Sequence, residues 1–241
     1  MRFKGIPWLR VCVEGAVIVG SILLAFALDA WWDNQNREDE LRDQLEIVAR
    51  EMQSTREALQ RVLSVHDMNA ELSGRLTSAL REVTPDSEVV FSDSVIGPLF
   101  PQATADVTTG ALDAFIAAGG LELIEDSEIR RQLLDWPARI EDVLDDEIYL
   151  RNFAAADLAS HLRANYAVAN AELLSTPLLL HRLAGAPPVS PDRLGTVTLR
   201  REQQLMNLLA ARESSERAMR TGLVNLMDEA ARIIDVLEAS R

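Results

Sequence analysis

The chain has 241 residues and a formal net charge of -14, with one cysteine and three histidines. The excess of acidic residues excludes a nucleic-acid partner bound through phosphate neutralisation. The single cysteine excludes an intrachain disulfide and a metal site built from several thiolates. Apolar residues make up 48% of the chain, which is enough for a core in one or two domains. Few glycines and prolines and many Ala, Leu, Glu and Arg residues indicate a mostly helical protein.

The first element is an apolar stretch from Gly15 to Leu28, bounded by one acidic residue at each end. As a helix these residues would extend about 21 Å, whereas the hydrocarbon core of a bilayer is about 30 Å thick. That length alone is typical of a signal peptide, and Ala25-Phe26-Ala27 offers a small-x-small cleavage site.

The residues around this stretch favour a membrane span that is retained. Trp8 and Trp31 would lie about 35 Å apart along a helix, so each ring would reach a headgroup layer, and Trp32 would lie beside Trp31. Glycine and proline are absent from 21–73, so the possible cleavage site would lie within continuous helix. We expect a transmembrane helix over 11–32, with a cleaved signal peptide and a buried soluble helix as the alternatives.

The charges at the two ends of the span predict its orientation. Arg2, Lys4 and Arg10 precede it, whereas the segment after it is rich in Asp and Glu. Because basic residues stay on the cytoplasmic side, we expect 1–10 to be cytoplasmic and 33–241 to be extracytoplasmic. In a Gram-negative bacterium this places the span in the inner membrane and the large domain in the periplasm, where a domain without disulfides is acceptable.

Glu14 is an acidic side chain within the expected span. Acidic groups inside a membrane often have a function. Arg10 lies one helical turn earlier, however, so the two side chains can pair near the cytoplasmic interface. Both interpretations of Glu14 remain open at this point. Cys12 precedes the apolar core and therefore cannot be the lipidated cysteine that follows a signal peptide.

Two long segments of the exterior part carry apolar residues at alternating spacings of four and three. The first runs from Leu41 to Leu80, with His66 on its apolar face, and the second from about Thr198 to Ala239. Only Arg212 and Glu216 interrupt the second pattern, and their separation lets them pair on one helix face. We expect an all-α fold in which the transmembrane helix continues into a mostly helical bundle, with long first and last helices packed antiparallel. Alternatively, one apolar face packs on a second copy as a coiled coil.

Shorter helical patterns lie between these two segments. Gly119-Gly120 predicts the end of one helix, and Asp126 or Ser127 can cap the next, which contains Pro137 and extends a helical pattern to about Leu174. Segment 83–105 is expected to be a loop, and it includes the possible short extended piece Val89-Val90-Phe91.

Two parts of the chain resemble a family of uncharacterised bacterial single-pass inner-membrane proteins. One is the span with its ending ALDAWWDNQNRED, and the other is the stretch TTGALDAFIAAGGLELIEDSEIRRQLLDWPARIED. The matching positions of the second stretch are Thr109, Leu112, Gly119 or Gly120, Leu121, Leu123, Ile124, Asp126 and Arg130. The resemblance implies a membrane location and a helical exterior domain of unknown function. It implies no catalytic residue.

Known catalytic and cofactor motifs are absent from the sequence: there is no P-loop, His-Glu-x-x-His, Gly-x-Ser-x-Gly or Gly-x-Gly-x-x-Gly. His66, His161 and His181 lack metal-ligand spacing, and we interpret His66 as a core histidine. The acidic cluster Glu141, Asp142, Asp145, Asp146 and Glu147 is best explained as a solvated helix face rather than a cation site. We therefore predict no catalytic residue, no metal site and no cofactor.

The expected partners are the lipid bilayer and either another protein or a second copy of the chain. The leading hypothesis is a non-enzymatic scaffold or accessory subunit that acts through protein contacts in the cell envelope. The alternative is a sensory or ligand-binding exterior domain, which would signal through a partner's membrane helix because ten cytoplasmic residues are too few for a signalling domain. An enzyme with unrecognised catalytic groups is the third hypothesis.

Overall fold

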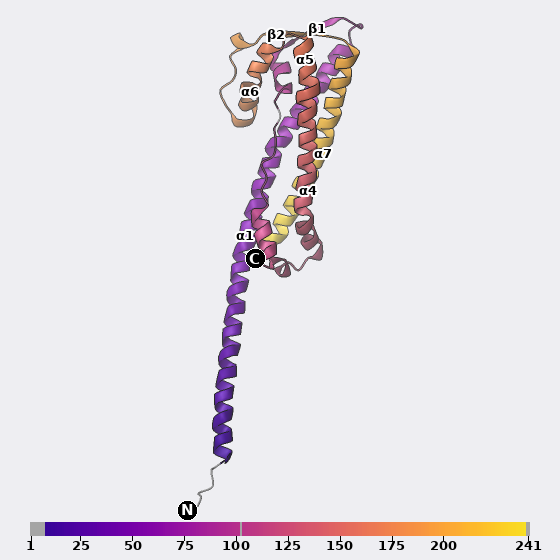
Figure 1. The fold of residues 1–241 in the computed structure, drawn as a ribbon. Helices are drawn as coiled ribbons and strands as arrows, with labels where there is room; N and C mark the ends of the chain where they lie inside the picture. Colours follow the sequence, from indigo (N-terminus) through magenta and orange to yellow (C-terminus); the bar gives the residue numbers. More distant parts are fainter. Residues whose placement is uncertain (1–7, 102, 240–241) are drawn as a thin grey trace, which may run out of the picture.

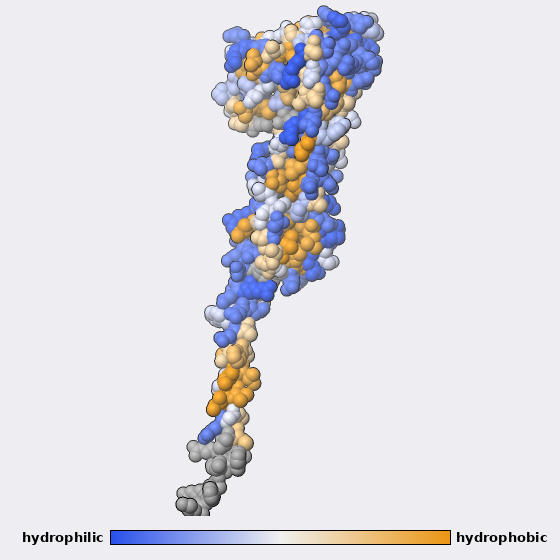
Figure 2. Space-filling view, in the orientation of Figure 1, coloured by the Kyte–Doolittle hydropathy of each residue, from blue (hydrophilic) through white to orange (hydrophobic). Residues whose placement is uncertain are grey.

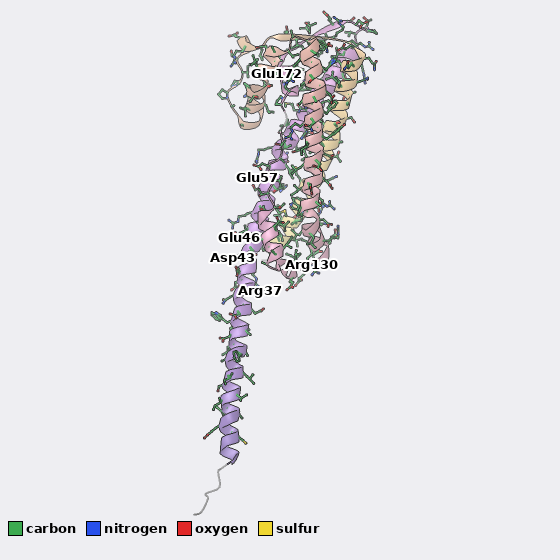
Figure 3. The ribbon with its side chains drawn as sticks, in the orientation of Figure 1. Arg37, Asp43, Glu46, Glu57, Arg130 and Glu172 are labelled. Carbon is green, nitrogen blue, oxygen red and sulfur yellow. The ribbon has the colours of Figure 1, made fainter. Side chains whose placement is uncertain are left out.

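Helix α1 (Trp8–Arg81) is a single helix of 74 residues, about 111 Å long at about 1.5 Å per residue. A computed structural model describes residues 8–101 and 103–239 of the chain. The N-terminal part of α1 extends alone, and its C-terminal part belongs to a helical head (Figure 1; Figure 3 shows the side chains in the same orientation). The long helix forms without interruption because no glycine or proline occurs between Gly20 and Gly74.

The head is a bundle of three long helical segments. Helix α7 (Gln203–Ala239) runs antiparallel to α1 and packs along it, as expected from the sequence (Figure 1). The third segment is formed by α4 (Ser127–Asn152), the π-helical turn η3 (Phe153–Leu158) and α5 (Ala159–Asn165). Pro137 lies within α4 and does not end it. The all-α architecture with packed first and last helices is therefore confirmed.

Small elements connect the long ones. Strands β1 (Glu88–Ser92) and β2 (Thr196–Arg200) form an antiparallel two-stranded sheet at the end of the head farthest from residue 8 (Figure 1). The other elements are α2 (Asp93–Ile96), η1 (Gly97–Leu99), α3 (Gly110–Ala117), η2 (Gly120–Leu123), α6 (Ala169–Ala184) and η4 (Pro191–Arg193).

Several predicted boundaries are confirmed and others are wrong. Segment 83–105 was expected to be a loop, but it contains β1, which includes the extended piece Val89-Val90-Phe91, followed by α2 and η1. Gly119 ends α3 in the left-handed conformation, with φ of 83°, and the Asp126 carboxylate caps α4 by accepting the N–H groups of Glu128 and Ile129. The last helix was expected from Thr198, but 196–200 is a strand because its β-branched residues pair with β1. The helical pattern predicted to reach Leu174 is broken between α5 and α6.

Two apolar clusters fill the head. The lower one joins the middle of α1 to α3, α4 and the C-terminal half of α7, and it includes Leu45, Met52, Phe115, Trp136, Leu223, Leu226 and Ile233. The upper one joins the end of α1 to α5, the sheet and the start of α7, and it includes Leu76, Leu80, Ile96, Leu162, Val197, Leu199, Leu205 and Leu209. The predicted apolar faces of α1 and α7 thus meet each other within one chain.

Among the described residues, one helix is long and apolar enough to cross a membrane: the N-terminal part of α1. The best 18-residue window of this helix has a mean hydropathy of 2.0 and is fully exposed in the isolated chain. Figure 2 shows a hydrophobic band on the extended part of α1, below a head whose surface is largely hydrophilic. A helix whose apolar side chains are exposed all round is unfavourable in water, which is consistent with a lipid environment.

Candidate functional site

The predicted membrane residues lie on this extended part of α1. Trp31 and Trp32 are exposed, with ring centroids 6.3 Å apart. Glu14 is also exposed at its position on the helix. Trp8 begins α1, but its side chain lies outside the described part of the structure, as does that of Arg10. Glu14, Trp31 and Trp32, whose side chains the structure describes, are all exposed and form no site with the head.

A layer of buried polar side chains separates the two apolar clusters, and we call His66, Asn69, Arg212 and Glu216 the polar layer. His66 Nδ1 lies 2.5 Å from Glu216 Oε2, and Arg212 Nε donates to Glu216 Oε1 at 2.5 Å. All four side chains are almost completely buried. With its amide nitrogen turned to donate to the carbonyl of Pro98, Asn69 accepts a hydrogen bond from Arg212. The prediction that Arg212 and Glu216 pair is confirmed.

The polar layer is not fully satisfied by the described residues. His66 Nε2 and Arg212 Nη1 have no hydrogen-bond partner among the described residues. The same holds for the buried hydroxyl of Ser73, one helical turn after Asn69. Burial lowers the pKa of Arg212, and the carboxylate of Glu216 opposes that effect. The layer is chemically a charge-paired core interaction, because its four side chains are almost completely buried and Glu216 contacts both His66 and Arg212.

Two carboxylates accept main-chain hydrogen bonds from the segment that leads into α3. The carboxylate of Glu51 in α1 accepts hydrogen bonds from the N–H groups of Ala111 and Leu112 at 2.9 and 3.2 Å. It therefore satisfies two free N–H groups in the first turn of α3. Glu147 of α4 accepts the N–H of Ala105 at 3.1 Å. Burial raises the pKa of Glu147, and the Ala105 N–H partly offsets this. Glu147 was predicted to lie on a solvated face, but it is 3% exposed; the other four acidic residues are on the surface as expected.

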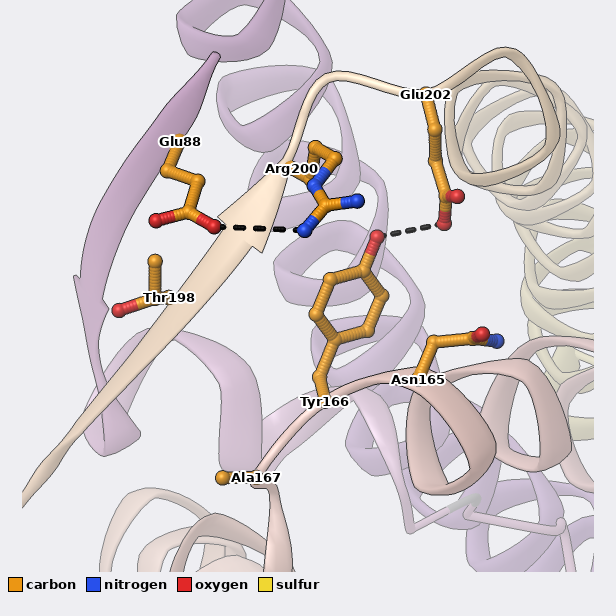
Figure 4. Close-up of a pocket in the computed structure, with 7 residues that line it drawn as sticks. All are labelled: Glu88, Asn165, Tyr166, Ala167, Thr198, Arg200 and Glu202. Carbon is orange, nitrogen blue, oxygen red and sulfur yellow. Dashed lines mark hydrogen bonds and ion pairs between the residues drawn. The ribbon is translucent and has the colours of Figure 1, made fainter. Parts of the chain in front are cut away.

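A polar cavity of about 310 Å³ lies in the head beside β2, and we call it the β2-edge pocket (Figure 4). Its walls come from both strands, the end of α5 with the turn after it, and the residue before α7. The lining residues are Glu88, Asn165, Tyr166, Ala167, Thr198, Arg200 and Glu202. Arg200 lies 3.6 Å from Glu88, across the sheet, and both side chains are more than half exposed.

Glu202 connects the pocket to a buried histidine. Its Oε1 accepts hydrogen bonds from the hydroxyl of Tyr166 at 2.6 Å and from His161 Nε2 at 2.7 Å. Partial burial, followed by the bond to Glu202, raises the pKa of Tyr166 above its usual value of 10.0. Burial acts to raise the pKa of Glu202, but the two donors outweigh it and the net direction is downward. Tyr166 therefore stays a neutral donor, and Glu202 an anion.

Sequence reasoning missed the β2-edge pocket. Its residues come from three separate segments of the sequence, and no spacing relates Tyr166 to Glu88 or Glu202. The described residues contain no group of three or more His, Cys, Asp or Glu side chains arranged to hold a metal ion. The geometry of the pocket offers hydrogen-bond donors, acceptors and charge, which suits binding.

No protein-family model, curated protein or solved structure matches the chain. The resemblance to a family of single-pass membrane proteins therefore has no support from these comparisons.

Proposed function

We propose that the protein is a non-enzymatic, membrane-anchored helical protein that binds other proteins in the cell envelope as a scaffold or accessory subunit. The observation that carries this proposal is the continuity of α1. The same helix forms the apolar candidate span and the centre of the head, with no break between them. A head joined to its anchor in this way is held at a fixed orientation to the membrane.

The location belongs to the same proposal. We place the span in a bacterial inner membrane, residues 1–10 in the cytoplasm and 33–241 in the periplasm, on the charge asymmetry around the span. The membrane-distal end of the head then carries the sheet and the β2-edge pocket (Figure 1). A binding surface at that end could reach partners well away from the bilayer.

A ligand-binding or sensory head is the second candidate, and the β2-edge pocket is the observation that favours it. The pocket is large enough for a small metabolite, and the polar side chains of Arg200, Glu202 and Tyr166 line it. A thermal-shift screen of the full chain against polar metabolites distinguishes this candidate, because a bound ligand raises the melting temperature in a saturable way.

The test of the leading proposal is purification of the full chain from its native membranes in mild detergent, followed by measurement of subunit stoichiometry. We expect a partner protein at a fixed ratio, or a homo-oligomer that persists on dilution. A matched preparation in which 11–32 is replaced by an unrelated membrane span shows whether the head suffices. A strictly monomeric chain with no stoichiometric partner would contradict the proposal.

A further inference from the structure

The outer edge of β2 has main-chain groups that the sheet leaves unpaired. At the two ends of the ladder, Arg201 N–H donates to the carbonyl of Ser87 at 2.8 Å, and Asp93 N–H donates to the carbonyl of Gly195 at 3.1 Å. Antiparallel pairs alternate between bonded and non-bonded. The register therefore makes Val90↔Thr198 a non-bonded pair. The N–H and C=O of Thr198 consequently point away from β1.

One side chain of the pocket, Tyr166, lies beside one end of this edge. Tyr166 and Arg200 line the same pocket, and Figure 4 shows the tyrosine ring beside β2 close to Arg200. Beyond Tyr166 the edge continues along Thr198, which is exposed and lines the β2-edge pocket. Figure 4 shows Tyr166 and Ala167 on one side of β2 and Glu88 on the other.

The charges around the pocket indicate which extended segment would bind. Glu88 and Glu202 contribute two carboxylates and Arg200 one guanidinium, so the lining is net negative. The whole chain carries a net charge of -14, which also attracts a basic partner and repels an acidic one. The strand itself is Thr-Val-Thr-Leu-Arg, whose β-branched residues hold an extended conformation.

We propose that β2 is a docking edge at which an extended, basic segment of a partner protein adds as a third strand. Main-chain hydrogen bonds to Thr198 supply the pairing, and the carboxylates of Glu88 and Glu202 select a Lys or Arg side chain on the segment. This inference rests on the proposed protein-binding function and names the partner's chemistry for it. The short edge limits the contact to a few residues.

The test uses proline as a probe of the edge. In Thr198→Pro the outward N–H is lost while the bonded pairs of the ladder remain, because proline is tolerated where the N–H of an edge strand faces outward. Val90→Pro is the matched control: Val90 is the ladder partner of Thr198, and its N–H points outward from the opposite edge. Circular dichroism melts of both full-length variants check that each head remains folded.

The probe is a displayed library of random ten-residue peptides, selected on the full chain in nanodiscs after depletion on empty nanodiscs. We expect enriched peptides with β-branched residues and at least one Lys or Arg. By fluorescence anisotropy, their affinity should fall at least tenfold with Thr198→Pro and stay within twofold with Val90→Pro. Glu88→Gln/Glu202→Gln should weaken the basic peptides and should not weaken the same peptides with Lys or Arg replaced by Gln.

Three outcomes would overturn the proposal: no enrichment, peptides that bind folded Thr198→Pro as tightly as the unaltered chain, or binding lost with Val90→Pro instead. The proposed function is scored separately by native purification. A stoichiometric partner that is still retained by Thr198→Pro leaves the function standing and rejects the edge. If peptides bind in an edge-dependent way but native purification yields no partner or oligomer, the docking edge stands and the proposed function is rejected.

Discussion

His66 and Glu216 lie 150 positions apart in the sequence, and the imidazole Nδ1 of one is 2.5 Å from the carboxylate of the other. Both are almost completely buried where α1 packs on α7. Apolar faces with four-three spacing fit together in more than one register, because neighbouring turns present similar residues. If one helix slid by a single turn, Glu216 and Arg212 would stay buried but would lose their contacts with His66 and Asn69. We infer that the polar layer fixes the register of the two long helices.

Removing one charge of the polar layer should be costly. Glu216→Leu leaves the guanidinium of Arg212 buried without its carboxylate, so we expect a loss of about 3–5 kcal/mol in unfolding free energy. The double variant Arg212→Met/Glu216→Leu removes both charges and should recover most of that loss. Chemical denaturation of Glu216→Leu, Arg212→Met and the double variant measures the coupling between the two side chains. Additive effects would show that the two side chains do not act as a pair.

The head should fold without the membrane helix. Described side chains from 12 to 34 are exposed, whereas the first buried one among the described side chains of α1 is Leu45. The fragment 38–241 therefore keeps both apolar clusters and the polar layer. We expect strong helical circular dichroism and one cooperative thermal transition. A non-cooperative melt, or a strand content above about a fifth, would contradict the fold.

Leu223 of α7 should contribute strongly to stability. It is completely buried in the lower cluster, so Leu223→Ala should cost about 2–5 kcal/mol through lost burial and a cavity. Arg220 is the matched control on the same helix: it forms an exposed ion pair with Asp67, worth about 0–1 kcal/mol. Thermal melts of the head fragment at several protein concentrations compare the two. A Leu223 effect that vanished at high concentration would indicate that the apolar face is intermolecular instead.

The long helices could be predicted because their signal is local. The four-three spacing gives the apolar faces of α1 and α7, and each face needs a long partner, so their pairing follows. The position of His66 on one face and of Glu216 on the other was visible too, but their contact depends on register, which apolar spacing does not determine. Asp126 and Gly119 were predictable because a helix cap and a left-handed turn depend on single residue types.

The β2-edge pocket could not be predicted for the opposite reason. Strand β2 has five residues and ends two residues before a long helix, so its residues from Thr198 onward were included in the helical pattern. Tyr166 and Glu202 meet only because the α5–α6 turn folds over the sheet. The burial of Glu147 was missed because its neighbours on α4 are solvated and only the distant Ala105 N–H explains its position.

Glu147 should make stability depend on pH in the direction opposite to a salt-bridged carboxylate. Burial raises its pKa in the folded state above the ordinary value of 4.5, so the folded chain binds the proton more tightly than the unfolded chain. Its contribution should thus increase stability as the pH falls through the raised pKa toward 4.5. The measurement is unfolding free energy against pH for the head fragment and for Glu147→Gln. Because Gln stays neutral at every pH, the gain in unfolding free energy of Glu147→Gln over the unaltered fragment should be largest above the raised pKa. It should shrink as the pH falls to 4.5. A gain that instead grows on acidification would refute the sign.

The orientation of the span can be tested with single cysteines, because Cys12 is the only native one. In a Cys12→Ser background, Asp39→Cys lies just beyond Trp32 on the side of the head, and Lys4→Cys lies before the span. If the head is periplasmic, a membrane-impermeant maleimide added to intact spheroplasts should label Asp39→Cys and leave Lys4→Cys unlabelled until the cells are lysed. Intact mass should show that the N-terminal segment is retained. The reverse labelling pattern would invert the topology, and a mature chain beginning near Leu28 would replace the anchor with a signal peptide.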